Sequence, residues 1–274
     1  ASFALGCKVN QYESEAIAEL FAEKGYEIVG IDEEADVYVI NTCTVTNFGD
    51  KKSRQLIRKV KRQNENAIVA VVGCYAQTAP KELMEIAGVN LVIGTKDRAQ
   101  IVEMVEQYDR ANGVENHVSD IMKERVFEPL SIQKLANRTR AYLKIQDGCS
   151  QYCSYCIIPY ARGPIRSREP QEVVAEVKRL AENGFKEVVL TGIHVASYGK
   201  DRRDTSLLDI LKQVHEVEGI ERIRFSSIEP NVVTEEFAQT MAALPKVCDH
   251  FHLSLQSGCD KTLKESKRHR FLAL

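Results

Sequence analysis

The chain has 274 residues, of which 44% are hydrophobic and 28% are charged, and this composition indicates a soluble globular protein with room for two domains. Its longest apolar runs, such as AIVAVVGCYA, fall short of the roughly 18 residues that a membrane span needs, which excludes a membrane-spanning protein. A formal net charge of −2 excludes nucleic-acid binding through the overall charge, so any nucleic-acid partner must bind a local basic surface.

The first part of the chain alternates short β-branched runs with amphipathic helical patterns. Strands are predicted at 2–5, 26–30, 36–41, 67–72 and 90–94, and helices at 12–24, 48–62, 79–86 and 98–108. This β/α alternation predicts a parallel sheet covered by helices. We therefore expect an N-terminal α/β domain over residues 1–108.

The pattern weakens over residues 109–140, which we interpret as a linker. It resumes with strands at 141–146, 187–192, 222–227 and 250–256, and with helices at 171–182, 206–217 and 235–243. This second alternation predicts the first part of a (β/α) barrel over residues 141–274. The predicted fold class is thus α/β, with an N-terminal parallel-sheet domain followed by an incomplete barrel.

Three cysteines of the first domain each follow a predicted strand, since Cys7 follows SFALG, Cys43 follows DVYVINT and Cys74 follows AIVAVVG. The carboxyl ends of parallel strands share one edge of a sheet, where ligand sites form. A single cysteine is more often a small buried apolar residue, but three at equivalent strand ends predict a shared ligand site. Because the N-terminus does not resemble a secretory signal, we expect a cytoplasmic protein whose cysteines are reduced.

The stretch CSQYCSYC places Cys149, Cys153 and Cys156 on one short loop after the predicted strand AYLKIQ. A structural zinc site needs a fourth ligand, and the nearest downstream histidine, His194, lies beyond a whole helix and strand, which disfavours zinc. Thiolates also hold iron-sulfur clusters. Three thiolates on a cluster of four irons leave one iron open for a substrate or cofactor.

The spacing C-x3-C-x2-C, with Tyr155 before the third cysteine, resembles the signature of the radical S-adenosylmethionine (SAM) enzymes. GCKVNQYES, NTCTVT and GCYAQ resemble the amino-terminal domain of the methylthiotransferases, and YCIIPYARGPIRSREP, LTGIHVASYG, SSIEP and HLSLQSG resemble their radical SAM domain. The resemblance covers about residues 3–261. Within this family, TGIH and RSREP are most similar to the members that act on N6-threonylcarbamoyladenosine in tRNA.

The resemblance implies two 4Fe-4S clusters and SAM as cofactors. One cluster, held by Cys149, Cys153 and Cys156, would bind SAM at its open iron and supply the electron that breaks SAM into a 5′-deoxyadenosyl radical. The implied product is a methylthio group at C2 of N6-threonylcarbamoyladenosine, at position 37 of tRNA, and no catalytic residue is implied beyond the cluster ligands. An auxiliary cluster that carries the inserted sulfur would be held by the first-domain cysteines Cys7, Cys43 and Cys74.

Further contacts to SAM are implied by the same resemblance. Gly192 would allow close approach of the backbone to the cofactor. The alternative for any one of these positions is ordinary strand-end capping or turn chemistry. The residues lie in the cysteine loop and at the carboxyl ends of the next three barrel strands, and they are Tyr155, Thr191, Gly192, Ser226, Ser227, Glu229 and Gln256.

Basic residues are concentrated in KKSRQLIRKVKR, a predicted helix soon after Cys43, and Arg162, Arg166 and Arg168 follow the cysteine loop. We expect these positive surfaces to contact phosphates of tRNA, whose anticodon loop presents unstacked bases that a pocket can take. A solvated helix face is the alternative for such a run of charge. The other implied partner is an electron donor protein.

Alternatives remain within the family and outside it. Related substrates are isopentenyladenosine in tRNA and an aspartate of a ribosomal protein. An iron-sulfur electron carrier would normally complete each cluster with a fourth cysteine, and a zinc-stabilised RNA-binding module would explain the basic helix. Family members usually continue through further barrel strands into an RNA-binding TRAM domain. Since this chain ends in KESKRHRFLAL, we expect those parts to be absent and full activity to be lacking.

Overall fold

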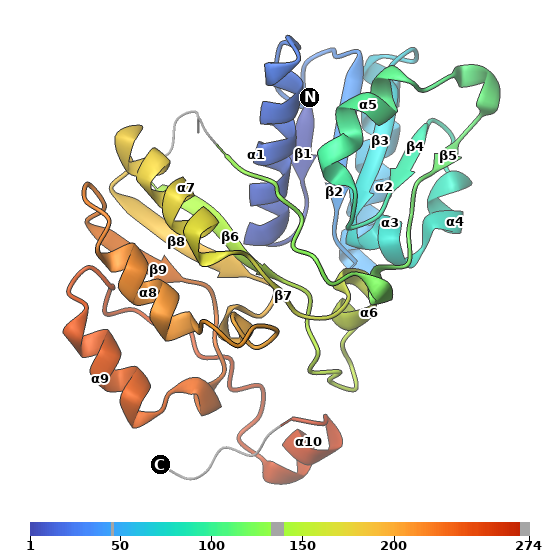
Figure 1. Cartoon of the computed structure of the whole chain (residues 1–274). Coiled ribbons are helices and arrows are strands. Elements are labelled where there is room, and N and C mark those ends of the chain that lie inside the picture. The colour runs from blue at the N-terminus through green and yellow to red at the C-terminus, as the bar shows by residue number, and fades with distance from the viewer. Residues whose placement is uncertain (45–46, 133–139, 269–274) are drawn as a thin grey trace. The chain divides into compact units, whose positions relative to one another are not determined.

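The computed structural model describes residues 1–44, 47–132 and 140–268 (Figure 1). The chain divides into two compact units, each built on its own sheet. Unit 1 comprises Ala1–Glu124, Glu128–Ile132 and Tyr160–Gly163, and unit 2 comprises Arg125–Phe127, Gln133–Pro159 and Pro164–Leu274.

Unit 1 contains a five-stranded parallel sheet in the order β1-β2-β3-β4-β5. Its strands are β1 (Ser2–Ala4), β2 (Val37–Thr42), β3 (Ile68–Gly73), β4 (Leu91–Ile93) and β5 (Glu115–Asn116). Its α-helices are α1 (Lys8–Glu23), α2 (Asn47–Gln63), α3 (Cys74–Thr78), α4 (Pro80–Met84) and α5 (Ile101–Glu106), and short 3₁₀ turns lie at Arg98–Gln100, Arg110–Asn112 and Ile121–Lys123.

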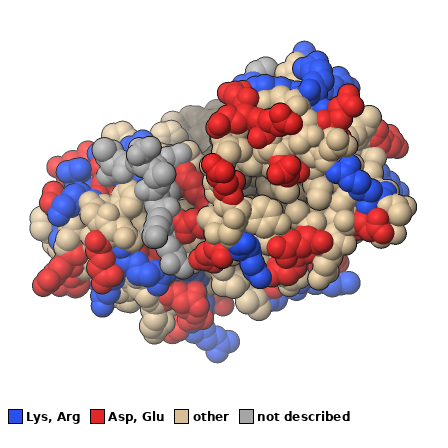
Figure 2. Space-filling view, turned by 90° about the horizontal axis from the view of Figure 1, so that it is seen from above, with Lys and Arg blue, Asp and Glu red and all other residues tan. Residues whose placement is uncertain are grey.

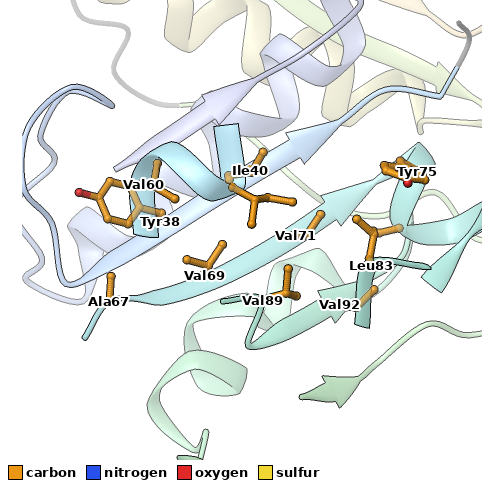
Figure 3. Close-up of a cluster of buried hydrophobic side chains, with 12 residues drawn as sticks. Tyr38, Ile40, Val60, Ala67, Val69, Val71, Tyr75, Leu83, Val89 and Val92 are labelled. Atoms are coloured by element: carbon orange, nitrogen blue, oxygen red, sulfur yellow. The ribbon is translucent and has the colours of Figure 1, made fainter. Parts of the chain in front are cut away.

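The sheet of unit 1 is buried on both faces, as alternate residues of β3 show. Val71 belongs to an apolar cluster with Val60 of α2, which Figure 3 shows in close-up. Val72 belongs to a second cluster with Ile17 of α1 and Ile101 of α5. A parallel strand that packs on both faces needs apolar residues at every position, and this explains the uninterrupted run IVAVV.

Unit 2 contains a four-stranded sheet in the order β7-β6-β8-β9. Strands β6, β8 and β9 are parallel, and the short β7 pairs antiparallel with β6. Its strands are β6 (Arg140–Asp147), β7 (Arg166–Ser167), β8 (Glu187–Gly192) and β9 (Arg222–Phe225). Its α-helices are α7 (Pro170–Glu182), α8 (Leu207–His215), α9 (Glu235–Ala243) and α10 (Asp260–Glu265), with 3₁₀ turns at Val195–Ser197 and Pro230–Val232. Helix α6 (Ile158–Arg162) begins in unit 2, and its last three residues fold with unit 1.

The helices after the barrel strands form because their apolar residues recur at helical spacing. In α8, Leu207, Ile210, Leu211 and Val214 are all buried, and Ser206 caps the helix by accepting a hydrogen bond from the backbone of Asp209. Strand, helix and parallel strand then follow in turn from β6 to β9. This is the first part of a partial (β/α) barrel, and the predicted fold class is confirmed.

Two of the predicted strands are wrong. Residues 26–30 form no strand; Tyr26 instead packs edge-on against Phe21, with ring centroids 5.1 Å apart, and Ile28 is exposed. Residues 250–256 form only an isolated bridge between Leu253 and Ile228. A short run with strand-like composition becomes a strand only where a neighbouring strand offers a partner along its length, and the sequence pattern does not reveal that partner.

Other differences concern boundaries and short elements that were not predicted, namely α3, β5, α6, β7 and α10. Helix α1 begins at Lys8, four residues before the prediction, because Val9 and Asn10 are buried as part of its first turn. Within the segment predicted as a linker, β5 and two 3₁₀ turns fold with unit 1, and residues 133–139 lie outside the described residues. The domain boundaries at 108 and 141 stay predictions. In the described part of the chain, no helix is long and apolar enough to cross a membrane.

Candidate cluster and cofactor sites

Three neighbouring strands of unit 1 end beside one another, and a cysteine follows each of them. Thr42 of β2 pairs with Gly73 of β3, so Cys43 and Cys74 both lie one residue beyond the same level of the sheet. Cys7 follows β1 and immediately precedes α1, while Cys74 is the first residue of α3. The structure therefore brings the three predicted cysteines to one edge, at the start of two helices whose amide groups favour negative charge.

Gly6 lets the first two of these cysteine loops approach closely. Its φ of +101° is in the region that favours glycine, and a Cβ built there would lie 2.6 Å from Cys43 Cβ and 2.7 Å from Cys43 Sγ. Asn10 holds the same loops together, because its side-chain amide donates to Leu5 O at 2.7 Å and to Thr42 O at 2.9 Å. The thiol of Cys43 is thus fixed against the turn that precedes Cys7.

Arg162 is fully buried among these residues of unit 1. Its Nε lies 3.2 Å from Cys74 Sγ and its Nη2 donates to Asn10 Oδ1 at 2.6 Å. Its guanidinium also pairs with Glu13 through Nη1–Oε1 at 2.5 Å and Nη2–Oε2 at 3.0 Å. Glu13 is itself fully buried and pairs with Arg98 Nη1 at 2.6 Å. A buried ionic network therefore borders this edge and contacts the sulfur of Cys74.

Burial and charge act in opposite directions on these thiols. Burial raises the pKa of Cys74, and desolvation around the sulfur raises the pKa of Cys7 although that residue as a whole is exposed; the positive charge of Arg162 opposes the rise at both. Cys7 Sγ also lies 3.7 Å from Asn10 Oδ1. Because thiolates are the form that binds metal, a buried cation at this edge favours the state that a cluster needs.

The second set of cysteines lies on the loop after β6 in unit 2. Cys149 and Cys153 are buried and Cys156 is half-buried. The amide of Cys156 donates to Cys153 O at 2.9 Å, which closes a tight turn between them. Burial raises the pKa of Cys149 to about 11, and the negative charges of Cys156, Cys153 and Glu229 add to the rise. The loop therefore holds the three thiols close enough for the charges of Cys153 and Cys156 to act on Cys149.

The predicted SAM-binding residues occupy the same edge of the unit 2 sheet, though in differing ways. Tyr155 Oη donates to Gln256 Oε1 at 3.3 Å, so these two residues meet across 101 positions of sequence. Thr191 is buried. Gly192 has a packing role of its own, because a Cβ there would lie 2.7 Å from the Oε1 of Gln146. Its role in binding the cofactor stays a prediction.

The residues after β9 continue this edge. Ser227 Oγ lies 2.6 Å from His252 Nδ1. Glu229 accepts from Arg268 Nη1 at 2.8 Å and lies 3.7 Å from His194 Nε2. Within the described residues, the buried Oγ of Ser226 has no hydrogen-bond partner, nor does His194 Nε2. Buried polar atoms of this kind ordinarily have a partner, so a polar ligand fits this edge.

The donor sets fit iron-sulfur chemistry. Each unit supplies three cysteine thiols at the carboxyl edge of its sheet, with one set beside a buried guanidinium. Among the residues that the structure describes, no group of three or more His, Cys, Asp or Glu side chains is arranged around a single ion. A cluster of four irons takes one thiolate on each of three irons, so its ligands do not converge on one point.

Sequence reasoning missed several residues of these sites, among them Gly6 and Arg98. Gln146, at the end of β6, is fully buried, accepts the backbone amide of His194 at 2.8 Å and fills the space beside Gly192. Asn10 and Glu13, on the first turns of α1, were not singled out because a polar residue near a helix start is usually a cap or a solvated side chain. For Glu13 the helix pattern was a usable signal, since this residue lies on the buried face of α1, whereas Asn10 precedes the predicted start of the helix.

The expectation that Arg162, Arg166 and Arg168 contact phosphate is wrong. Their exposed fractions are 0%, 2% and 4%, and each is engaged by a carboxylate. Arg166 lies 3.6 Å from Asp147, and Arg168 lies 2.6 Å from Glu176. A guanidinium removed from water needs such a partner, so these arginines are structural cations of the interior.

The basic helix α2 differs from these buried arginines, because several of its charged side chains are exposed. Lys51, Arg58 and Arg62 are exposed and recur at spacings of seven and four residues, which places them on one face of α2. We call these three the basic stripe. Arg54 is used inside unit 1, since it donates to Tyr75 Oη at 2.7 Å. Figure 2 shows acidic and basic side chains mixed over the face in view, in keeping with the net charge of −2.

Comparison with known protein families finds two matches. Residues 2–94 match uncharacterized protein family UPF0004, and residues 143–272 match the radical SAM superfamily. Among solved structures, the radical SAM methyltransferase TsrM from Kitasatospora setae has a TM-score of 0.57 at 18% identity, over 85% of this chain and 54% of that chain. This likeness shows a shared fold.

Several curated proteins resemble nearly the whole chain. This chain is 50% identical over 265 residues to the threonylcarbamoyladenosine tRNA methylthiotransferase MtaB of Bacillus subtilis. It is 41% identical over 260 residues to the protein of the same name from Aquifex aeolicus. It is 35% identical over 271 residues to the tRNA-2-methylthio-N(6)-dimethylallyladenosine synthase of Dictyoglomus thermophilum. These alignments cover 96%, 95% and 96% of this chain but only 59%, 63% and 60% of the relatives. The chain therefore spans about three fifths of their length.

Proposed function

We propose that this chain is a radical SAM methylthiotransferase that inserts a methylthio group at C2 of N6-threonylcarbamoyladenosine, at position 37 of tRNA. The observation that carries the proposal is the pair of three-cysteine sets, each at the carboxyl edge of its own sheet. The relatives that are 50% and 41% identical, both named for this nucleoside, support the choice of substrate.

In this proposal the two sets have separate tasks. The unit 2 set would hold a 4Fe-4S cluster with SAM, and the unit 1 set would hold an auxiliary cluster that carries sulfur. When bound, the first supplies a carbon radical and the second supplies the inserted sulfur. Cys149, Cys153 and Cys156 would be the ligands of the first cluster. The ligands of the second would be Cys7, Cys43 and Cys74.

The chain's own residues would place and shield these groups. Tyr155 and Gln256, joined by a hydrogen bond, would lie against SAM. The buried Oγ of Ser226 and Nε2 of His194 would offer hydrogen bonds to its polar groups. Gln146 would keep the end of β8 in place by its contact with the backbone of His194. The basic stripe on α2 would contact tRNA phosphates, and an electron donor protein in the cytoplasm would complete the system.

The experiment that tests the proposal counts iron and acid-labile sulfide after anaerobic reconstitution. The wild type should hold about eight irons per chain, and either triple variant, Cys149→Ala/Cys153→Ala/Cys156→Ala or Cys7→Ala/Cys43→Ala/Cys74→Ala, should hold about four. Cys248→Ala/Cys259→Ala is the matched control and should keep about eight. Zinc without iron, or no iron at all in one of the triple variants, would count against two independent clusters.

A second substrate has support of its own, because the relative from Dictyoglomus thermophilum is named for dimethylallyladenosine. The two candidates are distinguished by incubating the reconstituted protein with tRNAs that carry either nucleoside and identifying the products by mass spectrometry. A methylthio product from the threonylcarbamoyl substrate alone supports the proposal. Product from the dimethylallyl substrate alone would replace it.

A further inference from the structure

Arg162 directs its guanidinium donors at three different groups of unit 1. Nε faces the sulfur of Cys74 at 3.2 Å, while Nη1 and Nη2 reach Glu13 and Asn10. A buried arginine needs a carboxylate to offset the loss of water, and Glu13 meets that need. The contact with sulfur is additional. It places an N–H donor and a positive charge directly on one proposed ligand of the auxiliary cluster.

Ion pairs beside Cys74 join two arginines to two glutamates, so the charges of these four side chains balance. Arg162 pairs with Glu13, and Arg98 pairs with both Glu13 and Glu128, at 2.6 Å and 2.5 Å. Thiolates and a cluster therefore add negative charge beside two arginines and two glutamates whose own charges balance. A reduced cluster carries one more negative charge than an oxidised one, so its stability depends on the cation nearest to it. Hydrogen bonds to the sulfurs and net charge are the established controls on cluster potential.

We propose that Arg162 is a positioning residue that raises the reduction potential of the cluster at Cys7, Cys43 and Cys74, and that Glu13 opposes it. This inference rests on the proposed function, because it requires the auxiliary cluster. The two partners of one ion pair act with opposite signs. Removal of the arginine destabilises the reduced cluster, and removal of the carboxylate stabilises it.

The test measures the potential of the auxiliary cluster alone. In the Cys149→Ala/Cys153→Ala/Cys156→Ala background, any remaining cluster signal belongs to the unit 1 set. A redox titration with mediator dyes, with dithionite as the source of the single electron, is followed by electron paramagnetic resonance. Arg162→Gln should shift the reduction equilibrium at least tenfold toward the oxidised cluster, which is about 59 mV for one electron. Glu13→Gln should shift it in the opposite direction.

Two further variants separate charge from geometry. Arg162→Lys keeps the positive charge and loses the forked contacts. Its potential should therefore lie between that of the background protein and that of Arg162→Gln. Arg168→Gln is the matched control, because Arg168 is a buried arginine paired with Glu176 in unit 2. It should leave the potential unchanged. If Arg162→Gln fails to fold, Glu13→Gln/Arg162→Gln removes both buried charges together and should still lower the potential through loss of the N–H donor to sulfur.

The possible outcomes distinguish this inference from the proposed function. A background protein without iron overturns the auxiliary cluster, and the inference with it. Retained iron with the same potential in Arg162→Gln, Glu13→Gln and the background overturns the inference alone. Shifts of equal sign for the two partners would also overturn it, because a purely structural disturbance does not depend on the sign of the charge removed.

Discussion

At the scale of single residues, Gly6 has a backbone conformation that favours glycine, and Cys43 fills the space where a side chain would begin. Its φ is +101°, and a Cβ built there would lie 2.6 Å from Cys43 Cβ and 2.7 Å from Cys43 Sγ. Gly25 also has a positive φ, +88°, but nothing lies within 4 Å of its Cβ position. The two glycines thus share a backbone requirement and differ in the space around them.

Gly6→Ala should therefore cost more than Gly25→Ala. Each substitution should lose about 1–2 kcal/mol of stability from its backbone conformation, and Gly6→Ala should in addition push Cys43 out of place. We expect Gly6→Ala to reduce the iron content from about eight to about four per chain, while Gly25→Ala keeps about eight. Urea unfolding and iron analysis of both variants check this. Equal stability and full iron in both would mean that Cys43 is not held by this turn.

The sequence predicted the cysteines and missed their surroundings, for a physical reason. Strands that end in cysteine at equivalent places predict a shared edge, because register in a parallel sheet repeats from strand to strand. The contact of Arg162 with Glu13 joins residues 149 positions apart. Nothing in the sequence around Arg162 separates a buried cation from a phosphate contact. The burial of both side chains, which decides between them, is a property of the folded chain.

At the scale of elements, Glu187 joins the strands of unit 2 at their amino ends. Its carboxylate accepts from Arg222 Nε at 2.8 Å and Arg224 Nε at 2.9 Å, both on β9. Burial acts to raise the pKa of Glu187, but the hydrogen bonds and charges of the two arginines together hold it below the usual 4.5. Folding therefore stabilises the ionised form of Glu187 relative to its protonated form.

The lowered pKa of Glu187 determines how its contribution to the stability of the fold depends on pH. Because the pKa is lowered on folding, the stabilisation by Glu187 is fully present above pH 4.5 and is lost as pH falls through the folded-state value below it. Glu187→Gln should lose about 1–2 kcal/mol of stability at pH 7 in urea unfolding, and less in acid. Glu221→Gln is the matched control, because Glu221 pairs with Lys186 on the surface and should change stability by less than about 0.5 kcal/mol. An equal loss at neutral and acid pH would contradict this role.

The sequence predicted every strand that has neighbours on both sides and also the edge strands β1 and β9, but it missed the short edge strands β5 and β7. β3 and β8 have continuous apolar runs and lie in the middle of their sheets. Residues 26–30 have a similar composition but form no strand. Composition measures how well a segment suits a buried sheet, whereas a strand also needs a partner that brings hydrogen bonds to its edge.

At the scale of the whole molecule, local and overall charge differ in sign. The chain carries a net charge of −2, yet α2 contains seven Lys and Arg residues and one Asp. A polyanion would be repelled weakly by the molecule as a whole and attracted at the basic stripe. Contact with phosphates releases bound counterions, so the salt dependence of binding reports how many contacts form.

Lys51→Glu/Arg58→Glu/Arg62→Glu should weaken tRNA binding and lower the slope of log affinity against log salt by about two to three, one contact for each residue. Lys178→Glu/Lys200→Glu/Lys212→Glu changes the net charge equally at three exposed positions of unit 2. It should leave the slope unchanged. Fluorescence anisotropy with labelled tRNA at several salt concentrations gives both slopes, and a common slope would show that only net charge acts.

The four residues Tyr160–Gly163 fold with unit 1, although the chain on both sides of them folds with unit 2. A gene fragment that encodes residues 1–132 therefore omits Arg162 and leaves the carboxylate of Glu13 without that cation. The same fragment also omits Ala161, whose carbonyl accepts from Thr95 Oγ1 at 2.7 Å. The amino-terminal unit is thus not a portable module. A chimera that exchanges unit 2 for the corresponding unit of another protein must keep these four residues of this chain as an insertion in the foreign sequence.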